Sequence, residues 1–137
     1  MKSYCTVLLQ IIVVLPLLGC QQPSDRTSNN QTIPPPRLVH SVYFWLNNDI
    51  SPQDRHRFFE HLNKLSEIPT VQNFLIGPPA NTDKRDIIDN SYDLGIVTTF
   101  ASMADHDAYQ VSDIHQALLK MAKPLIAKVN VYDISYK

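Results

Sequence analysis

Hydrophobic and polar residues alternate with a period of two in residues 38–46, near the start of the last hundred residues of the chain. This stretch is rich in Val, Tyr, Phe and Trp, which predicts a strand. The alternation places two sets of side chains on opposite faces of that strand, namely His40, Val42, Phe44 and Leu46 against Val39, Ser41, Tyr43 and Trp45. Because both faces carry large apolar groups, we expect both to be covered.

Two later stretches have the three-to-four-residue spacing of helices. The first begins with a capping residue, Ser51, followed by Pro52, and continues as an apolar stripe of Phe58, Phe59, Leu62 and Leu65. The second begins in the same way at Ser102 and runs to about Tyr109. After a break it resumes as a stripe of Ile114, Ala117, Leu118, Met121 and Leu125. The spacing therefore predicts one helix and a second helix that is split.

Three more strands are predicted at residues 71–76, 92–100 and 128–136, with a charged loop at 81–90. The resulting order, β-α-β-β-α-β, indicates a ferredoxin-like α+β fold. In that fold both helices pack on one face of the sheet. We expect the opposite face to expose apolar side chains such as Val129 and Val131, and a homodimer to cover them by packing sheet against sheet.

The first 37 residues show neither the alternation of a strand nor the spacing of an amphipathic helix. A positive start, Lys2, precedes an apolar run at residues 7–18, which is shorter than the roughly 20 apolar residues that cross a bilayer. It is typical of a secretory signal and ends in Leu-Leu-Gly-Cys, which resembles the lipobox of bacterial lipoproteins. The resemblance implies that residues 1–19 are a signal peptide and that acylated Cys20 anchors the chain in a lipid bilayer of the cell envelope. Gln21, which replaces the aspartate that retains enterobacterial lipoproteins at the inner membrane, favours the outer membrane.

The composition of the chain excludes several classes of function. Residues 20–37 are dominated by Gln, Ser, Asn, Thr and Pro and are expected to form a disordered tether before a domain at residues 38–137. The chain has 12 basic and 13 acidic residues and no basic stripe, so nucleic acid is not an expected partner. Three glycines provide no phosphate-binding loop. With Cys5 in the signal peptide and Cys20 acylated, no thiol is left for a disulfide or a nucleophile.

Several short segments then point to one family. The strand VHSVYFWL at residues 39–46 resembles an H-x-V-x-F-x-L opening strand, and it is followed in order by FLIG at 74–77, LG at 94–95 and FAS at 100–102. Tyr109 is followed six residues later by His115. Together these segments resemble the stress-responsive α/β-barrel family, Dabb, over residues 38–137. The resemblance implies a dimeric α+β barrel with a small cavity between sheet and helices in each protomer.

The resemblance also implies candidate site residues. A plant polyketide cyclase of this family works without a cofactor and uses a tyrosine and a histidine at the positions of Tyr109 and His115, with a strand histidine at the position of His40. In such chemistry His115 would act as the base, Tyr109 would orient a substrate carbonyl and His40 would support them. The chain departs from the family at 112–113, where Ser-Asp replaces a frequent His-Pro. It also has Leu94 where the cyclase has a further histidine.

Other polar residues point less clearly to chemistry. His56 and His61 are five positions apart, which does not place them on one helix face as a chelating pair. The segment Asp-His-Asp at 105–107, together with Asp113, has ligand types for a cation, but Asp105 is expected in a helix cap and the others in solvent. We therefore expect no metal and no cofactor.

Three functions stay open at this point. The favoured one is a lipid-anchored, homodimeric module, stress-associated or binding a small apolar or aromatic molecule. The alternative is a cofactor-independent cyclase or lyase that acts on a carbonyl-containing, polyketide-like substrate. The third is a structural interaction protein whose cavity is filled by its own side chains.

Overall fold

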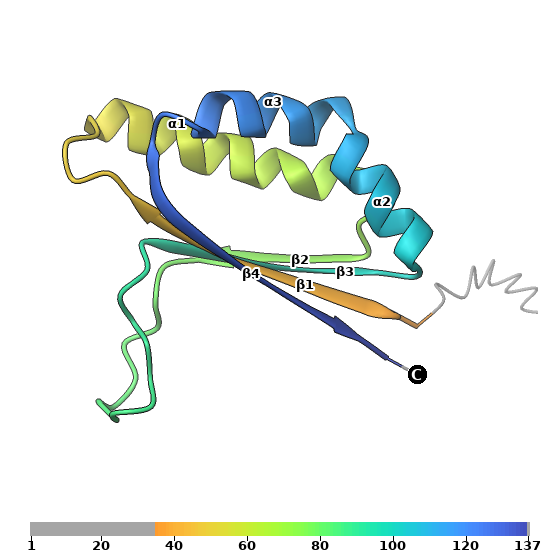
Figure 1. The fold of residues 1–137 in the computed structure, drawn as a ribbon, viewed down its shortest axis with the longest axis horizontal. Helices are drawn as coiled ribbons and strands as arrows, with labels where there is room; N and C mark the ends of the chain where they lie inside the picture. The colour runs from red at the N-terminus through yellow and green to blue at the C-terminus, as the bar shows by residue number, and fades with distance from the viewer. Residues whose placement is uncertain (1–34, 137) are drawn as a thin grey trace, which may run out of the picture. The chain divides into compact units, whose positions relative to one another are not determined.

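Four antiparallel strands form the sheet, in the spatial order β2-β3-β1-β4. Their bounds are β1 Leu38–Leu46, β2 Asn73–Gly77, β3 Leu94–Phe100 and β4 Ile126–Ser135. In the central pair, β1 and β3, every second side chain is buried, as the alternation predicted. The ferredoxin-like α+β fold is therefore confirmed, in a computed structural model that describes residues 35–136 (Figure 1).

The helices lie together on one side of this sheet (Figure 1). They are α1 Pro52–Asn63, which a 3₁₀ turn η1 (Lys64–Glu67) extends, α2 Met103–Val111 and α3 Asp113–Ala122. Ser51 and Ser102 cap α1 and α2, since each hydroxyl oxygen accepts a hydrogen bond from the backbone N–H three residues later. The predicted split of the second helix is confirmed. It falls at Ser112, which ends α2 and caps α3.

The core lies between the sheet and the helices. Its most deeply buried apolar side chains come from both layers and are Phe58, Leu62, Leu65, Ile96 and Phe100. Burial of one such side chain contributes about 1.5–3 kcal/mol to folding. The apolar stripe of α1 that was read from the sequence thus supplies much of the helical side of the core, except for Phe59, which is partly exposed.

The expectation for Val129 and Val131 is wrong about the face on which they lie. In the register of β4 against β1, Val131 pairs with Val42 and Val129 pairs with Phe44. Val42 and Phe44 are buried beneath the helices, so the two valines point to the helical side as well. They are about half exposed because β4 is an edge strand.

The opposite face of the sheet carries a different set of apolar groups. Leu75, Tyr132 and Ile134 are exposed there, and Tyr132 contacts Tyr43 with their ring centres 6.2 Å apart. The loop between β2 and β3 extends away from the helices (Figure 1), and the indole N–H of Trp45 donates to the Ser91 hydroxyl of this loop. We refer to this surface as the bare face, since no helix of residues 35–136 covers it.

The signal peptide, Cys20 and most of the tether lie outside the described residues and stay predictions. Within residues 35–136, none of the helices combines the length and the apolar character that crossing a bilayer requires.

Candidate functional site

A cavity of about 230 Å³ lies between the sheet and α3. Its walls are mainly aliphatic, with four polar residues among them: His40 from β1, Tyr109 and Gln110 from α2, and His115 from α3. Val129, Val131 and Leu119 line the cavity and are also about half exposed, so its mouth lies between α3 and β4. The three residues expected from the sequence, His40, Tyr109 and His115, thus come from three elements to line one cavity.

His115 lies in the first turn of α3, directly after the break in the helix. Its Nδ1 is 3.1 Å from the backbone oxygen of Gln110. Because a carbonyl oxygen only accepts hydrogen bonds, Nδ1 carries the ring proton and Nε2 is the unprotonated nitrogen. Burial lowers the pKa of His115, so the ring is neutral at pH 7. His115 therefore has the form that a general base requires.

Ser112 fixes the position of this base relative to Tyr109. Its hydroxyl donates to the backbone oxygen of Tyr109 at 2.8 Å and accepts from the backbone N–H of His115 at 3.3 Å. The Tyr109 and His115 rings are 4.7 Å apart. The serine that replaces the family's frequent histidine thus holds the two site residues together through their backbones.

Tyr109 is 1% exposed. Burial raises the pKa of its phenol, so the hydroxyl stays protonated over the whole physiological pH range. A protonated phenol beside a neutral imidazole can donate a hydrogen bond to a carbonyl oxygen or to a developing oxyanion.

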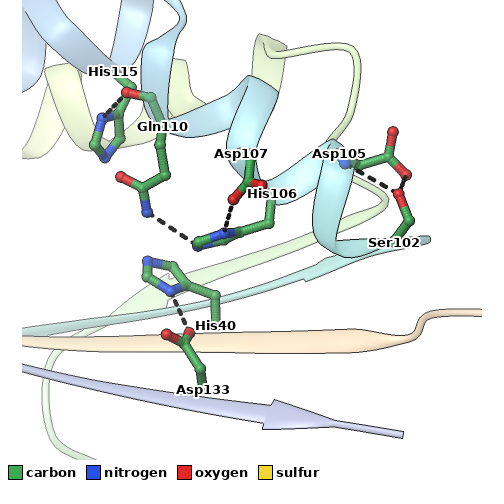
Figure 2. Close-up of polar contacts among 8 residues, drawn as sticks. All are labelled: His40, Ser102, Asp105, His106, Asp107, Gln110, His115 and Asp133. Carbon is green, nitrogen blue, oxygen red and sulfur yellow. Dashed lines mark hydrogen bonds and ion pairs between the residues drawn. The ribbon is translucent and has the colours of Figure 1, made fainter. Parts of the chain in front are cut away.

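His40 is buried beneath α2 and forms a carboxylate–imidazole pair with Asp133 (Figure 2). Its Nδ1 is 2.7 Å from Oδ1 of Asp133, which lies directly opposite on β4. Burial lowers the pKa of His40, while the hydrogen bond and the charge of Asp133 act in the other direction. The carboxylate orients the ring, as the third member of a catalytic triad orients its histidine.

His106 was expected in solvent, and this expectation is wrong. The ring lies over His40 with their centres 5.1 Å apart and contacts Phe100 at 5.4 Å. Its Nε2 accepts a hydrogen bond from the side-chain amide of Gln110, 3.0 Å away (Figure 2). The spacing of three residues from Tyr109, which places both on one helix face, is the signal that was available.

The remaining polar residues lie where the sequence placed them. Asp105 is in the cap of α2, with its backbone N–H 3.1 Å from the Ser102 hydroxyl. His56 is exposed on α1 beside Glu60, and His61 contacts the backbone oxygen of Arg57, so neither joins the cavity. Asp133 was missed, because only the register of β4 against β1 brings it to His40.

Comparison with known families identifies the class to which this fold and cavity belong. Residues 38–136 match the Dabb family, described as the stress responsive A/B barrel domain. The chain therefore belongs to the Dabb family. A search of curated proteins found no match to the chain.

Solved structures with the same fold include proteins with and without a stated activity. One is a hydroxynitrile lyase from Passiflora edulis, with a TM-score of 0.63 and 21% identity over 75% of this chain and 96% of that one. A Dabb family protein from Mesorhizobium loti has a TM-score of 0.59 and 23% identity over 75% and 99%. A dimeric ferredoxin-like protein of unknown function from Thermobifida fusca has a TM-score of 0.59 and 22% identity over 72% and 90%. At these identities the likeness establishes the fold.

Proposed function

We propose that this protein is a membrane-anchored lipoprotein whose dimeric Dabb domain binds a small apolar or aromatic molecule. The observation that carries the proposal is the cavity itself, about 230 Å³ in volume and walled by aliphatic side chains. An apolar cavity of about 150 Å³ is large enough to bind benzene. The volume therefore suits a single substituted aromatic ring, and it is smaller than the roughly 300–1,000 Å³ of sites for drug-sized ligands.

The polar groups of the cavity indicate which substituent the bound aromatic ring carries. The Tyr109 hydroxyl is a donor, and the Nε2 atom of neutral His115 is an acceptor. An aromatic ketone matches the donor of this pair, because its oxygen accepts from the phenol while the ring packs on the aliphatic wall, and Nε2 of His115 stays free. The ligand class is thus an aromatic ring that carries a carbonyl group.

Acetophenone and α-methylstyrene test this assignment as a matched pair, since they differ only in C=O against C=CH₂. We expect saturable binding of acetophenone to the purified chain by calorimetry. Tyr109→Phe should weaken acetophenone binding about fivefold, the value of one net hydrogen bond of about 1 kcal/mol, and leave α-methylstyrene binding unchanged.

A cavity-filling change completes this test. Leu118→Trp, in the cavity wall, should abolish binding of both compounds, and Val111→Trp, outside the cavity, should not. Failure of both compounds to bind the wild-type chain contradicts the proposal and leaves the structural interaction protein as the better description.

The alternative function is a cofactor-independent cyclase or lyase that acts on a carbonyl-containing, polyketide-like substrate. The unprotonated Nε2 of His115 beside the Tyr109 phenol favours it, since one can take a proton from carbon and the other can donate to the oxyanion. The hydroxynitrile lyase among the structural neighbours is consistent with such chemistry on this fold. His40, oriented by Asp133, would support the two.

Deuterium exchange separates binding from catalysis with the same probe. In D₂O, a base at His115 would remove a methyl proton of acetophenone, Tyr109 would stabilise the enolate, and a deuteron would return to carbon. Exchange that His115→Ala abolishes, with acetophenone still bound, supports the enzyme. Binding of acetophenone without exchange above the buffer rate supports the binding module.

The membrane anchor rests on the Leu-Leu-Gly-Cys segment at residues 17–20. We expect the wild-type chain in the outer-membrane fraction of a Gram-negative cell and Cys20→Ser outside it, since acyl chains supply the binding energy. Cys5→Ser is the matched control and should leave the distribution unchanged. Membrane association of Cys20→Ser equal to wild type contradicts the lipid anchor.

A further inference from the structure

Beside the cavity, three potential metal ligands from three different elements converge. They are His40 of β1, His106 of α2 and Asp133 of β4, and one ligand atom of each lies within 4.8 Å of the other two (Figure 2). Two imidazole nitrogens and one carboxylate oxygen are a ligand set that zinc and its neighbours in the first transition row prefer. We propose that these three side chains bind one divalent ion of this class.

The three ligand atoms lie within 4.8 Å of one another, so small side-chain movements would bring them to the spacing of a bound ion. Metal–nitrogen and metal–oxygen bonds of about 2.0–2.2 Å place the ligand atoms of a tetrahedral ion about 3.4 Å apart. Nδ1 of His40 and Oδ1 of Asp133 are 2.7 Å apart, because they share a proton. When an ion binds Nδ1, the ring proton of His40 moves to Nε2, and Nδ1 and Oδ1 separate by less than an ångström. The half-exposed side chain of Asp133 has room for that movement.

The surroundings of the His106 ring suit a metal ligand. Its Nδ1 is buried without a hydrogen-bond partner among the described residues, and the nearest carboxylate, of Asp107, lies 3.5 Å away. Metal-bound histidines commonly direct their other ring N–H toward a carboxylate. With Nδ1–H directed to Asp107, Nε2 is free to bind the ion in place of the Gln110 amide, which is 3.0 Å from it.

The surroundings favour an ion with an open position. The rings of Phe100 and Tyr109 pack against both histidines and hold them in place. Three protein ligands leave at least one coordination position free, as in catalytic zinc sites. His40 belongs to both the ion site and the cavity wall, so the free position is close to a cavity ligand.

This inference is independent of the proposed binding function, because His106 is not part of the cavity wall. The chain can therefore bind the metal without binding acetophenone, or bind acetophenone without binding the metal. A bound ion would occupy His40 and leave His115 as the base for any chemistry in the cavity.

Cobalt titration of the full chain, purified in detergent and treated with a chelator, tests the site. We expect the visible absorption of low-symmetry Co²⁺ to saturate at one ion per chain and to disappear on addition of Zn²⁺. His106→Gln and Asp133→Asn should each weaken binding at least about tenfold. His56→Gln, on exposed α1, is the matched control and should bind as wild type does.

Thermal unfolding provides the second readout. Zn²⁺ should raise the unfolding temperature of the wild-type chain and of His56→Gln, and should raise that of His106→Gln and Asp133→Asn much less. Circular dichroism without metal establishes that these variants fold. Absence of saturable Co²⁺ binding, or wild-type affinity in a folded His106→Gln or Asp133→Asn chain, overturns the assigned ligands.

Discussion

The two faces of the sheet are built from the same strands but have different surroundings and different chemistry. On the helical face of β1, His40, Val42 and Phe44 are buried against α2 and α3 and line the cavity. On the bare face of the same strand, Tyr43 and Trp45 are only partly buried. Alternation along one strand thus assigns ligand chemistry to one side and an apolar surface to the other, and a register slip by one residue would exchange them.

The largest expected effect is on the helical face. Phe100→Ala removes a fully buried ring that contacts His40, His106 and Tyr109. We expect the free energy of unfolding to fall by about 3–5 kcal/mol in urea titrations. Ile87→Ala, at a side chain that is 88% exposed in the β2–β3 loop, should change it by less than about 0.5 kcal/mol. Similar losses in the two variants would contradict the location of the core.

The second effect concerns association through the bare face. We expect Tyr132→Lys with Ile134→Lys to weaken a homodimer at least thirtyfold by sedimentation, about 2 kcal/mol, because charge would be buried in an apolar interface. Val111→Lys, an exposed site on the helical side, is the control and should leave the dimer intact. A wild-type chain that is monomeric at micromolar concentration would rule out the interface.

The pH dependence of stability just below pH 6.5 reports the buried histidines of the helical face. Burial holds the folded pKa values of His40 and His115 below 6.5, so the unfolded chain takes up protons first as pH falls. Stability from these groups is complete above pH 6.5. As the pH is lowered from 6.5 to the folded pKa values, this stability decreases, with a slope of no more than about 1.4 kcal/mol per pH unit for each histidine. His40→Gln with His115→Gln should reduce this slope in urea titrations at several pH values, and an unchanged slope would contradict their burial as neutral rings.

The smallest expected effect distinguishes the two capping serines, Ser112 and Ser102. Ser112→Ala and Ser102→Ala should each cost about 1 kcal/mol in the free energy of unfolding. Only Ser112→Ala should also weaken acetophenone binding, since Ser112 alone bridges Tyr109 and His115. Equal affinity in the two variants would show that this bridge does not position the site.

Elements that depend on local signals were predictable from the sequence. The alternation of residues 38–46 placed His40 on the same face as Val42, and the helical spacing predicted the helix starts and the split of the second helix. These features depend on strand period and on capping, which neighbouring residues determine. The family segments were likewise sufficient to bring His40, Tyr109 and His115 to one cavity.

Features that depend on tertiary register were not predictable in the same way. Alternation divides β4 into two faces but does not say which one meets the helices, so Val129 and Val131 were assigned to the wrong side. The same register pairs Asp133 with His40. His106 is turned inward by its packing on Phe100 and His40, an effect that the polar neighbours Asp105 and Asp107 conceal in the sequence.

Intermolecular nuclear Overhauser effects between acetophenone and methyl-labelled protein report which face of the sheet holds the ligand. We expect contacts from the aromatic protons to methyl groups of Leu118, Val129 and Val131, which line the cavity on the helical face. Contacts confined to Leu75 and Ile134 of the bare face would contradict it.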